Sequence, residues 1–111
     1  CDNDYERQLE IDAMMAFVRD AKAGIGPMPL DKDTPIIVTG DMNLVGSKEN
    51  IETLLTGNII NQSTYGPSFT PDWDGSAFED LIPYATNTPM AFTWHDQFSS
   101  FSPGRLDAMI Y

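Results

Sequence analysis

The segment TPIIVTGDMN, residues 34–43, predicts the centre of the fold. Residues 36–39 form a short run rich in β-branched side chains without polar alternation, which is typical of a strand that is covered on both faces. Gly40 then lets the backbone turn sharply or approach another group closely. We therefore expect a strand in the middle of a sheet, with its carboxyl end at the edge where open α/β sheets bind ligands.

Two polar side chains follow this strand directly. Asp41 brings a carboxylate and Asn43 a neutral amide to the same edge. One interpretation is a strand-ending turn in which Asp and Asn side chains hydrogen-bond to their own backbone. The other is a binding or catalytic edge. This segment alone is compatible with both.

Two later segments, residues 92–95 (FTWH) and 105–111 (RLDAMIY), also have the composition of short strands. In the second, strand alternation places Leu106, Ala108 and Ile110 on one face, and Arg105, Asp107, Met109 and Tyr111 on the other. Taken alone, this arrangement is also that of a surface Arg–Asp neighbour pair, which contributes little to stability.

Taken in order, GDMN at 40–43, TW at 93–94 and RLD at 105–107 resemble the signature of the endonuclease/exonuclease/phosphatase superfamily. That superfamily contains metal-dependent phosphoesterases, among them abasic-site and DNase I-like nucleases, sphingomyelinases and inositol-polyphosphate phosphatases. The resemblance covers residues 3–111. It implies an α/β fold, namely part of a DNase I-like two-sheet α/β sandwich, here one mixed sheet with packed helices, and it identifies residues 1–111 as a C-terminal fragment of that domain.

The resemblance also implies roles for single residues. Asp41 would bind or lie near a Mg²⁺ ion, or Mn²⁺ in its place, and would orient the attacking water. Asn43 would donate its side-chain amide to a phosphate oxygen. Asp107 would hydrogen-bond a histidine and set its tautomer, as in other His–Asp pairs. Trp94, with Thr93, would form the wall of the site beside the substrate. Hard divalent ions prefer such carboxylate oxygens.

The sequence departs from the superfamily pattern at several points. The pattern requires an Asn and a metal-binding Glu on earlier strands, a central His and a final Ser-Asp-His, none of which matches a position in this sequence. His95 fits neither family histidine and is expected to be an ordinary loop residue, and Arg105 is expected to be a structural ion-pair partner. We expect an enzymatic parent protein and an inactive isolated fragment. The alternative is a non-catalytic binding or scaffold domain that retains the fold.

The charge of the chain bears on its partners. Six basic and 17 acidic residues give a net charge of −11, and no basic patch is visible. Nucleic-acid binding rests largely on Lys and Arg meeting phosphates, so a small-molecule or lipid-headgroup phosphate ester is the favoured substrate. No apolar run is long enough to predict a transmembrane segment. The single Cys1 allows no internal disulfide, so the compartment stays open, and an extracytoplasmic location is compatible with a signal outside this piece.

Two helices are expected. The first spans residues 3–23, starts with a capping box of Asn3 and Glu6, and exposes its polar residues Arg7, Glu10, Arg19 and Lys22 to solvent. The apolar stripe of this first helix consists of Leu9, Ile11, Ala13, Met14, Met15, Phe17 and Val18. The second helix spans residues 48–56, is capped by Ser47 and is ended by Gly57.

Residues 58–91 are rich in loop signals, and loops of this length are often functional. Four aromatic side chains in this segment are expected to be buried under the loop, with ligand contact as the alternative: Tyr65, Phe69, Trp73 and Phe78. The string DWDG at 72–75 has carboxylates suited to Ca²⁺ but lacks the full ligand spacing of a calcium loop. An apolar face left uncovered by a partial sandwich is expected to be buried by self-association.

Overall fold

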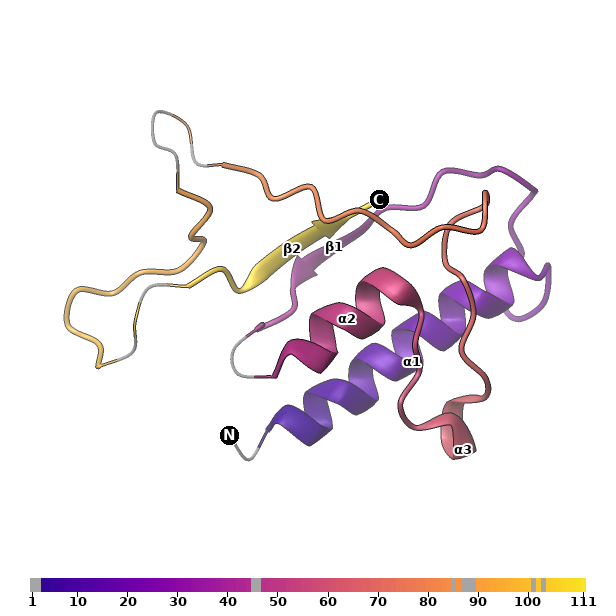
Figure 1. Ribbon diagram of the computed structural model, residues 1–111, viewed down its shortest axis with the longest axis horizontal. Helices are drawn as coiled ribbons and strands as arrows, with labels where there is room; N and C mark the ends of the chain where they lie inside the picture. The colour runs from indigo at the N-terminus through magenta and orange to yellow at the C-terminus, as the bar shows by residue number, and fades with distance from the viewer. Residues whose placement is uncertain (1–2, 45–46, 85, 87–89, 101, 103) are drawn as a thin grey trace.

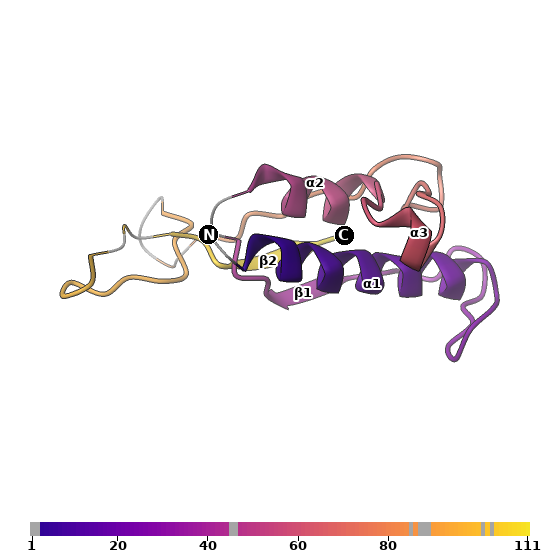
Figure 2. The same ribbon diagram turned by 90° about the horizontal axis from the view of Figure 1, so that it is seen from below.

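The computed structural model describes residues 3–44, 47–84, 86, 90–100, 102 and 104–111. It is a small mixed α/β structure, and helices and strands alternate irregularly along the chain (Figure 1). In chain order the elements are α1 (Asp4–Lys22), β1 (Val38–Asp41), α2 (Lys48–Thr56), α3 (Gln62–Tyr65) and β2 (Asp107–Ile110). The longest helices, α1 and α2, lie side by side and cover one face of the two-stranded sheet (Figures 1 and 2).

Helix α1 matches the expected span, but its start differs from the prediction. Asn3 is the N-cap residue, yet its side chain makes no capping hydrogen bond, so the predicted capping box is wrong. The first turn is closed instead by the Asn3 carbonyl, which accepts a hydrogen bond from the backbone N–H of Arg7 at 3.0 Å. Asp4 and Glu6 place negative charge in this first turn, where the helix dipole favours it.

The buried face of α1 is also rotated from the expected stripe. Ile11, Met15 and Val18 are buried as predicted, whereas Ala13 and Phe17 are exposed. Two polar residues, Gln8 and Asp12, take their place in the buried face. The reason is that α1 packs on α2, which presents polar partners at the interface.

Those partners are Asn50 and Thr53, both buried on α2. The Gln8 side chain donates to Thr53 Oγ1 at 2.9 Å and accepts from Asn50 Nδ2 at 2.7 Å. The two helices are therefore joined by side-chain hydrogen bonds as well as by apolar contact. The spacing of apolar residues along α1 could not predict that Gln8 and Asp12 belong to its buried face.

Helix α2 confirms both of its predicted ends. Ser47 Oγ accepts a hydrogen bond from the Glu49 N–H at 3.2 Å, and Gly57 adopts the left-handed conformation with φ 70°. The Gly57 N–H donates to the Thr53 carbonyl at 2.9 Å, which closes the last turn. Both signals are local, so the sequence alone was sufficient to place them.

The sheet differs from the expected one. β1 and β2 pair antiparallel, with Val38 opposite Ile110 and Asp41 opposite Asp107. The other edge of β2 is covered by residues 79–81, since Glu79 and Tyr111 exchange backbone hydrogen bonds at 2.7 and 3.0 Å. β2 is therefore the inner strand.

The prediction that residues 36–39 form a central strand covered on both faces is wrong. β1 begins two residues later, and its residues alternate between half-buried and exposed. Ile37, just before it, is 60% exposed. Among the described residues the pairing is wholly antiparallel, so the mixed sheet that was expected is not seen there.

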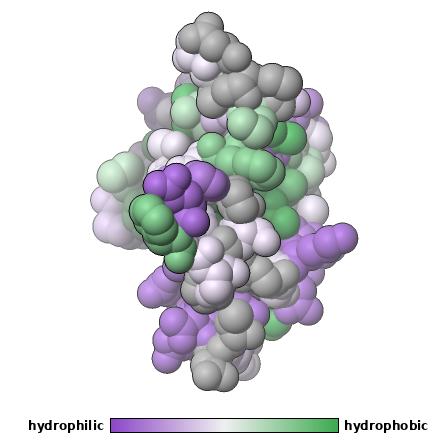
Figure 3. Space-filling model, turned by 90° about the vertical axis from the view of Figure 1, so that its left-hand side faces the viewer, coloured by the Kyte–Doolittle hydropathy of each residue, from purple (hydrophilic) through white to green (hydrophobic). Residues whose placement is uncertain are grey.

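Two other segments were misassigned. Residues 92–95 do not form a strand; Trp94 makes a single antiparallel bridge with Gly104. The short helix α3 was not predicted, because a four-residue helix leaves no periodic signal. Residues 90–100 project away from the helices (Figure 1), and the end of the molecule on this side carries hydrophobic and hydrophilic residues intermixed (Figure 3).

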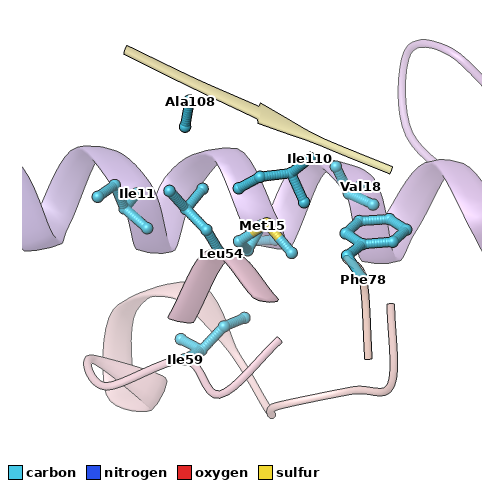
Figure 4. Packing of buried hydrophobic residues seen from close by; sticks show 9 residues of the cluster. Ile11, Met15, Val18, Leu54, Ile59, Phe78, Ala108 and Ile110 are labelled. Carbon is cyan, nitrogen blue, oxygen red and sulfur yellow. The ribbon is translucent and has the colours of Figure 1, made fainter. Parts of the chain in front are cut away.

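The core lies between the helical pair and the sheet. Its buried side chains come from α1, α2, the segment after α2 and β2 (Figure 4), and they are Ile11, Met15, Ala16, Val18, Leu54, Ile59, Phe78, Ala108 and Ile110. Phe78 is buried, as expected, while Tyr65 and Phe69 are partly buried and pack against the core. Within the described ranges, no helix combines the length and apolar character that crossing a membrane requires.

The loop after α2 is tied to α1 by two of the basic residues that were expected to be solvated. Arg19 donates to the carbonyls of Tyr65 and Pro67 at 2.8 and 2.9 Å. Lys22 donates to the carbonyls of residues 70, 71 and 72 at 3.1, 2.6 and 2.7 Å. Lys22 also lies 4.9 Å from the centroid of the Trp73 ring. These side chains hold the loop in place, so the prediction of simple solvation is wrong.

Candidate functional site

Asp41 and Asp107 face each other across the two strands, at the end of β1 and the start of β2 (Figure 1). The neighbouring residues Met42 and Leu106 are joined by a backbone hydrogen bond, in which the Met42 N–H donates to the Leu106 carbonyl at 3.1 Å. In an antiparallel ladder such pairs alternate, so Asp41 and Asp107 form a non-hydrogen-bonded pair, in which opposite Cα atoms lie only about 4.5 Å apart. Their side chains therefore leave the same face of the sheet, from Cα atoms at the closer of the two cross-strand spacings.

Asn43 lies beside this pair in a tight turn. Its backbone N–H donates to Asp41 Oδ1 at 2.9 Å, and its φ of 49° is left-handed, which Asn tolerates better than most residues. The strand-ending-turn interpretation is thus correct for one oxygen of Asp41. Asp41 Oδ2 has no hydrogen-bond partner in the part of the chain that the structure describes, and the side chain of Asn43 is exposed.

Thr93 fixes the strand that carries Asp107. Its hydroxyl oxygen accepts hydrogen bonds from the backbone N–H groups of Leu106 and Asp107, at 3.0 and 3.2 Å. Trp94, the next residue, exchanges backbone hydrogen bonds with Gly104 at 3.0 and 3.1 Å. The TW segment therefore supports the entry to β2 through its backbone and one hydroxyl. The carboxylate of Asp107 has no hydrogen-bond partner among the described residues.

Arg105 is a structural ion-pair residue, as expected, but its partner was not foreseen. Its Nη2 donates to both carboxylate oxygens of Asp80, at 2.6 and 2.7 Å, and its Nε donates to the backbone carbonyl of Asp107 at 3.0 Å. The ion pair thus links Asp80, in the segment along the outer edge of β2, to Arg105, two residues before Asp107. Nothing in the spacing of Asp80 and Arg105, 25 residues apart, indicates this contact.

A hollow of about 460 Å³ lies between the end of β1 and the first turns of α1. Asp41 and Asn43 line it from the strand side. The side chains that line it from α1 include Glu6, Arg7 and Glu10. Arg7 is largely buried and pairs with Asp4 at 2.6 Å, so a guanidinium lies near the otherwise acidic wall. The sequence pattern of this helix predicts a packing role and no chemistry.

The donor set can be compared with what a hard cation requires. Mg²⁺ is held by one or two carboxylates and keeps several waters, and Asp41 and Asp107 supply two carboxylates on one face. In the described ranges no group of three or more His, Cys, Asp or Glu residues is arranged to hold a metal ion. Two carboxylates lie within the one or two that Mg²⁺ usually takes from a protein.

The two remaining sequence candidates have other roles. His95 is exposed, as expected of a loop histidine. Asp74 Oδ1 accepts a hydrogen bond from the Ser76 N–H at 2.8 Å, and Asp72 Oδ1 accepts one from the Trp73 N–H at 2.6 Å. The hydrogen bonds from Ser76 lower the pKa of Asp74. These carboxylates close a turn, so the calcium alternative gains no support from their geometry.

No protein-family model matches the chain, and neither curated proteins nor solved structures gave a match. The fold and site define a small mixed α/β protein with two opposed carboxylates at one end of an antiparallel pair of strands.

Proposed function

We propose that the protein containing this chain is a Mg²⁺-dependent phosphoesterase related to the endonuclease/exonuclease/phosphatase superfamily. The observation that carries the proposal is the opposition of Asp41 and Asp107, with Asn43 two residues beyond the first. The three residues singled out by the sequence resemblance are 66 positions apart at their extremes, yet they lie together at one end of the sheet. Mn²⁺ would serve in place of Mg²⁺.

The geometry suits distinct roles for these residues. Two like charges directly opposite in a sheet destabilise it unless a cation or a donor lies between them. When bound there, Mg²⁺ would supply neutralising charge to the phosphoryl oxygens. Asp41 Oδ2 would accept a hydrogen bond from the attacking water and orient it. Asn43 would donate its exposed side-chain amide to a phosphate oxygen. Asp107 would orient a hydrogen-bond donor, which is a histidine in the resembled superfamily.

The substrate we favour is a phosphate ester of a small molecule or a lipid headgroup. A net charge of −11 opposes the approach of a polyanion such as DNA. A small phosphate ester carries few charges and needs only a local site. Trp94 would then contribute to the wall beside the leaving group.

A second candidate function is that of a non-catalytic binding or scaffold domain. It is favoured by one observation: Asp41 Oδ1 is already engaged by the Asn43 N–H, as in an ordinary turn. In that case the carboxylate pair would be a structural feature with no substrate.

The experiment uses the full gene product that contains these 111 residues. Hydrolysis of lipid, inositol, nucleotide and DNA phosphate esters is measured with Mg²⁺ and again with a chelator. Asp41→Asn and Asp107→Asn are expected to lower kcat by about 10²-fold or more, the usual loss for a group that positions the reacting proton. Asp31→Asn, which changes an exposed acid outside the site, is the matched control.

The outcomes separate the two candidates. Activity that requires Mg²⁺ and collapses only in the two site variants supports the phosphoesterase. A folded protein that hydrolyses none of the esters supports the scaffold, as does one whose activity is unchanged by Asp41→Asn. Faster cleavage of DNA than of any small ester at physiological salt would overturn the substrate preference.

A further inference from the structure

Two side chains hold the backbone of Asp107 on the side that faces away from β1. Because Asp41 and Asp107 form a non-hydrogen-bonded pair, the N–H and C=O groups of Asp107 point away from β1. The N–H donates to the hydroxyl oxygen of Thr93 at 3.2 Å, and the carbonyl accepts from Arg105 Nε at 3.0 Å. The direction in which the Asp107 side chain leaves the sheet therefore depends on Thr93 and Arg105.

Arg105 is oriented in turn by Asp80. Its Nη2 donates to both carboxylate oxygens of Asp80, at 2.6 and 2.7 Å, and the two side chains are only 18% and 17% exposed. The backbone around Asp80 is itself fixed, because Asp80 forms a bridge with Ile110 and the Leu81 N–H donates to the Met109 carbonyl at 3.0 Å. Asp80 thus connects the end of β2 to the residue that supports its start.

The guanidinium of Arg105 is also close enough to disable the candidate site. Its Nε already lies 3.0 Å from the carbonyl oxygen of Asp107, so the carboxylate of the same residue is within its reach. A hydrogen bond between two charged groups is stronger than one to a neutral carbonyl. A largely buried guanidinium that loses its partner carries an uncompensated charge, which is costly. It would then pair with the Asp107 carboxylate, which the proposed reaction needs free.

The other side of Arg105 offers no alternative acid. A hollow of about 230 Å³ lies there, beside the start of α2. The described residues that line it are Leu44, Ser47, Lys48, Ile51, Asp80 and Arg105. Asp80 is the only carboxylate in this described lining, and the ammonium of Lys48 repels a second cation. A guanidinium released by Asp80 therefore turns toward Asp107.

We propose that Asp80 is a positioning residue of the site. It holds Arg105 against the backbone of Asp107, and it keeps the guanidinium away from the Asp107 carboxylate. The inference rests on the proposed phosphoesterase function, and Asp80 itself contacts neither substrate nor metal in it. Loss of Asp80 therefore lowers kcat and leaves KM nearly unchanged, and simultaneous loss of Arg105 suppresses the defect.

The kinetic test uses the full gene product as wild type, Asp80→Ala, Arg105→Gln and the double variant. Asp80→Ala releases the guanidinium and is expected to lower kcat by about tenfold to a hundredfold, the range that misplacing a reacting group costs. Arg105→Gln removes the charge but keeps an amide that can donate to the Asp107 carbonyl, so it should lose less. The double variant should match Arg105→Gln. An ion pair that only stabilises the fold predicts equal losses in all three variants.

Conservative replacement guards against a folding failure of the alanine protein. Asp80→Glu keeps a carboxylate for Arg105, so it should retain most of the kcat of the wild type. Circular dichroism checks that each variant is folded. If Asp80→Ala does not fold, the proposal is decided by the double variant and Asp80→Glu, and a Glu variant with less activity than the double variant would contradict it.

A measurement that needs no activity separates this proposal from the phosphoesterase proposal. The carboxyl carbon-13 resonance of Asp107 reports whether a guanidinium has paired with that carboxylate. It should shift in Asp80→Ala and should return, in the double variant, to its position in Arg105→Gln. An unchanged resonance in Asp80→Ala, or a kcat defect that Arg105→Gln fails to suppress, would overturn the role of Asp80. Activity that survives Asp41→Asn would overturn the phosphoesterase instead, and the resonance would then decide the role of Asp80 alone.

Discussion

Replacing Asp12 by alanine is expected to destabilise the protein strongly, because its carboxylate is the centre of a buried hydrogen-bond network. Asp12 is fully buried. Oδ1 accepts hydrogen bonds from Gln8 Nε2 at 2.9 Å and from the Ile60 N–H at 3.1 Å. Oδ2 accepts from the Asn61 N–H at 2.8 Å and from Asn61 Nδ2 at 2.7 Å. One side chain on α1 thus satisfies two backbone donors 48 and 49 residues away.

The magnitude follows from the donors that the substitution leaves behind. A buried donor without a partner costs about 1–3 kcal/mol. Gln8 Nε2 is buried and counts in full at about 1–3 kcal/mol, whereas the part-buried N–H groups of Ile60 and Asn61 count at the lower end, about 1 kcal/mol each, which gives about 3–5 kcal/mol with about 4 kcal/mol as the centre. A domain of this size has a total stability of about 5–15 kcal/mol, so the loss is a large fraction of it.

Urea unfolding followed by far-UV circular dichroism measures the effect. Glu10→Ala is the matched control, since Glu10 lies on the same helix and is exposed. Its free energy of unfolding should stay within about 0.5 kcal/mol of the wild type. If Asp12→Ala and Glu10→Ala unfold at the same urea concentration, the buried network contributes nothing and the reasoning fails.

The same network predicts how stability depends on pH. Burial acts to raise the pKa of Asp12, but the hydrogen bonds from Asn61, Gln8 and Ile60 outweigh it and hold the pKa below its ordinary value of 3.8. Because the folded pKa is lower than the unfolded one, the unfolded chain binds more protons in acid. The contribution of Asp12 is therefore complete above the ordinary pKa and is lost as the pH falls through the folded pKa. The stability gap between the wild type and Asp12→Ala should narrow below about pH 4.

Three further substitutions probe the loop that follows α2. Gly57→Ala should cost more than about 2 kcal/mol, because the new Cβ would overlap the backbone carbonyl of Phe69 and the φ of 70° is left-handed. Gly75→Ala, at φ 84° with no atom near its Cβ, should cost only the backbone strain of about 1 kcal/mol, and equal costs in urea unfolding would contradict the overlap. Lys22→Met keeps much of the packing but removes three hydrogen bonds to carbonyls 70–72, so it should cost about 1–3 kcal/mol and speed limited proteolysis of that loop. An unchanged cleavage rate would refute the tethering role of Lys22.

The parts of the fold that the sequence predicted correctly are those with local causes. The ends of α2 depend on one hydroxyl at Ser47 and one left-handed residue at Gly57, and both act within a few residues. The alternation along β2 is also local, and Ala108 and Ile110 are buried on one face as expected. Such signals need no knowledge of the remaining chain.

The parts that the sequence missed depend on distant partners. Gln8 and Asp12 look like solvent-facing residues of α1 until Thr53, Ile60 and Asn61 are brought against them. Likewise, the apolar run at 36–39 is typical of a strand covered on both faces, but the burial of β1 depends on what lies beside it. No local pattern states which edge of which strand will be paired.

The register of β1 and β2 explains why the candidate site forms at all. Shifting β2 by one residue would expose Ala108 and Ile110 and turn Asp107 and Met109 toward the core. Exposing the isoleucine alone would cost about 1.5–3 kcal/mol, and burying an unpaired carboxylate would cost more. The repulsion between Asp41 and Asp107 amounts to only about 0.2–1 kcal/mol. Core packing therefore fixes the register, and the register holds the two carboxylates opposite each other on a rigid element, which is the support that a binding or catalytic site requires.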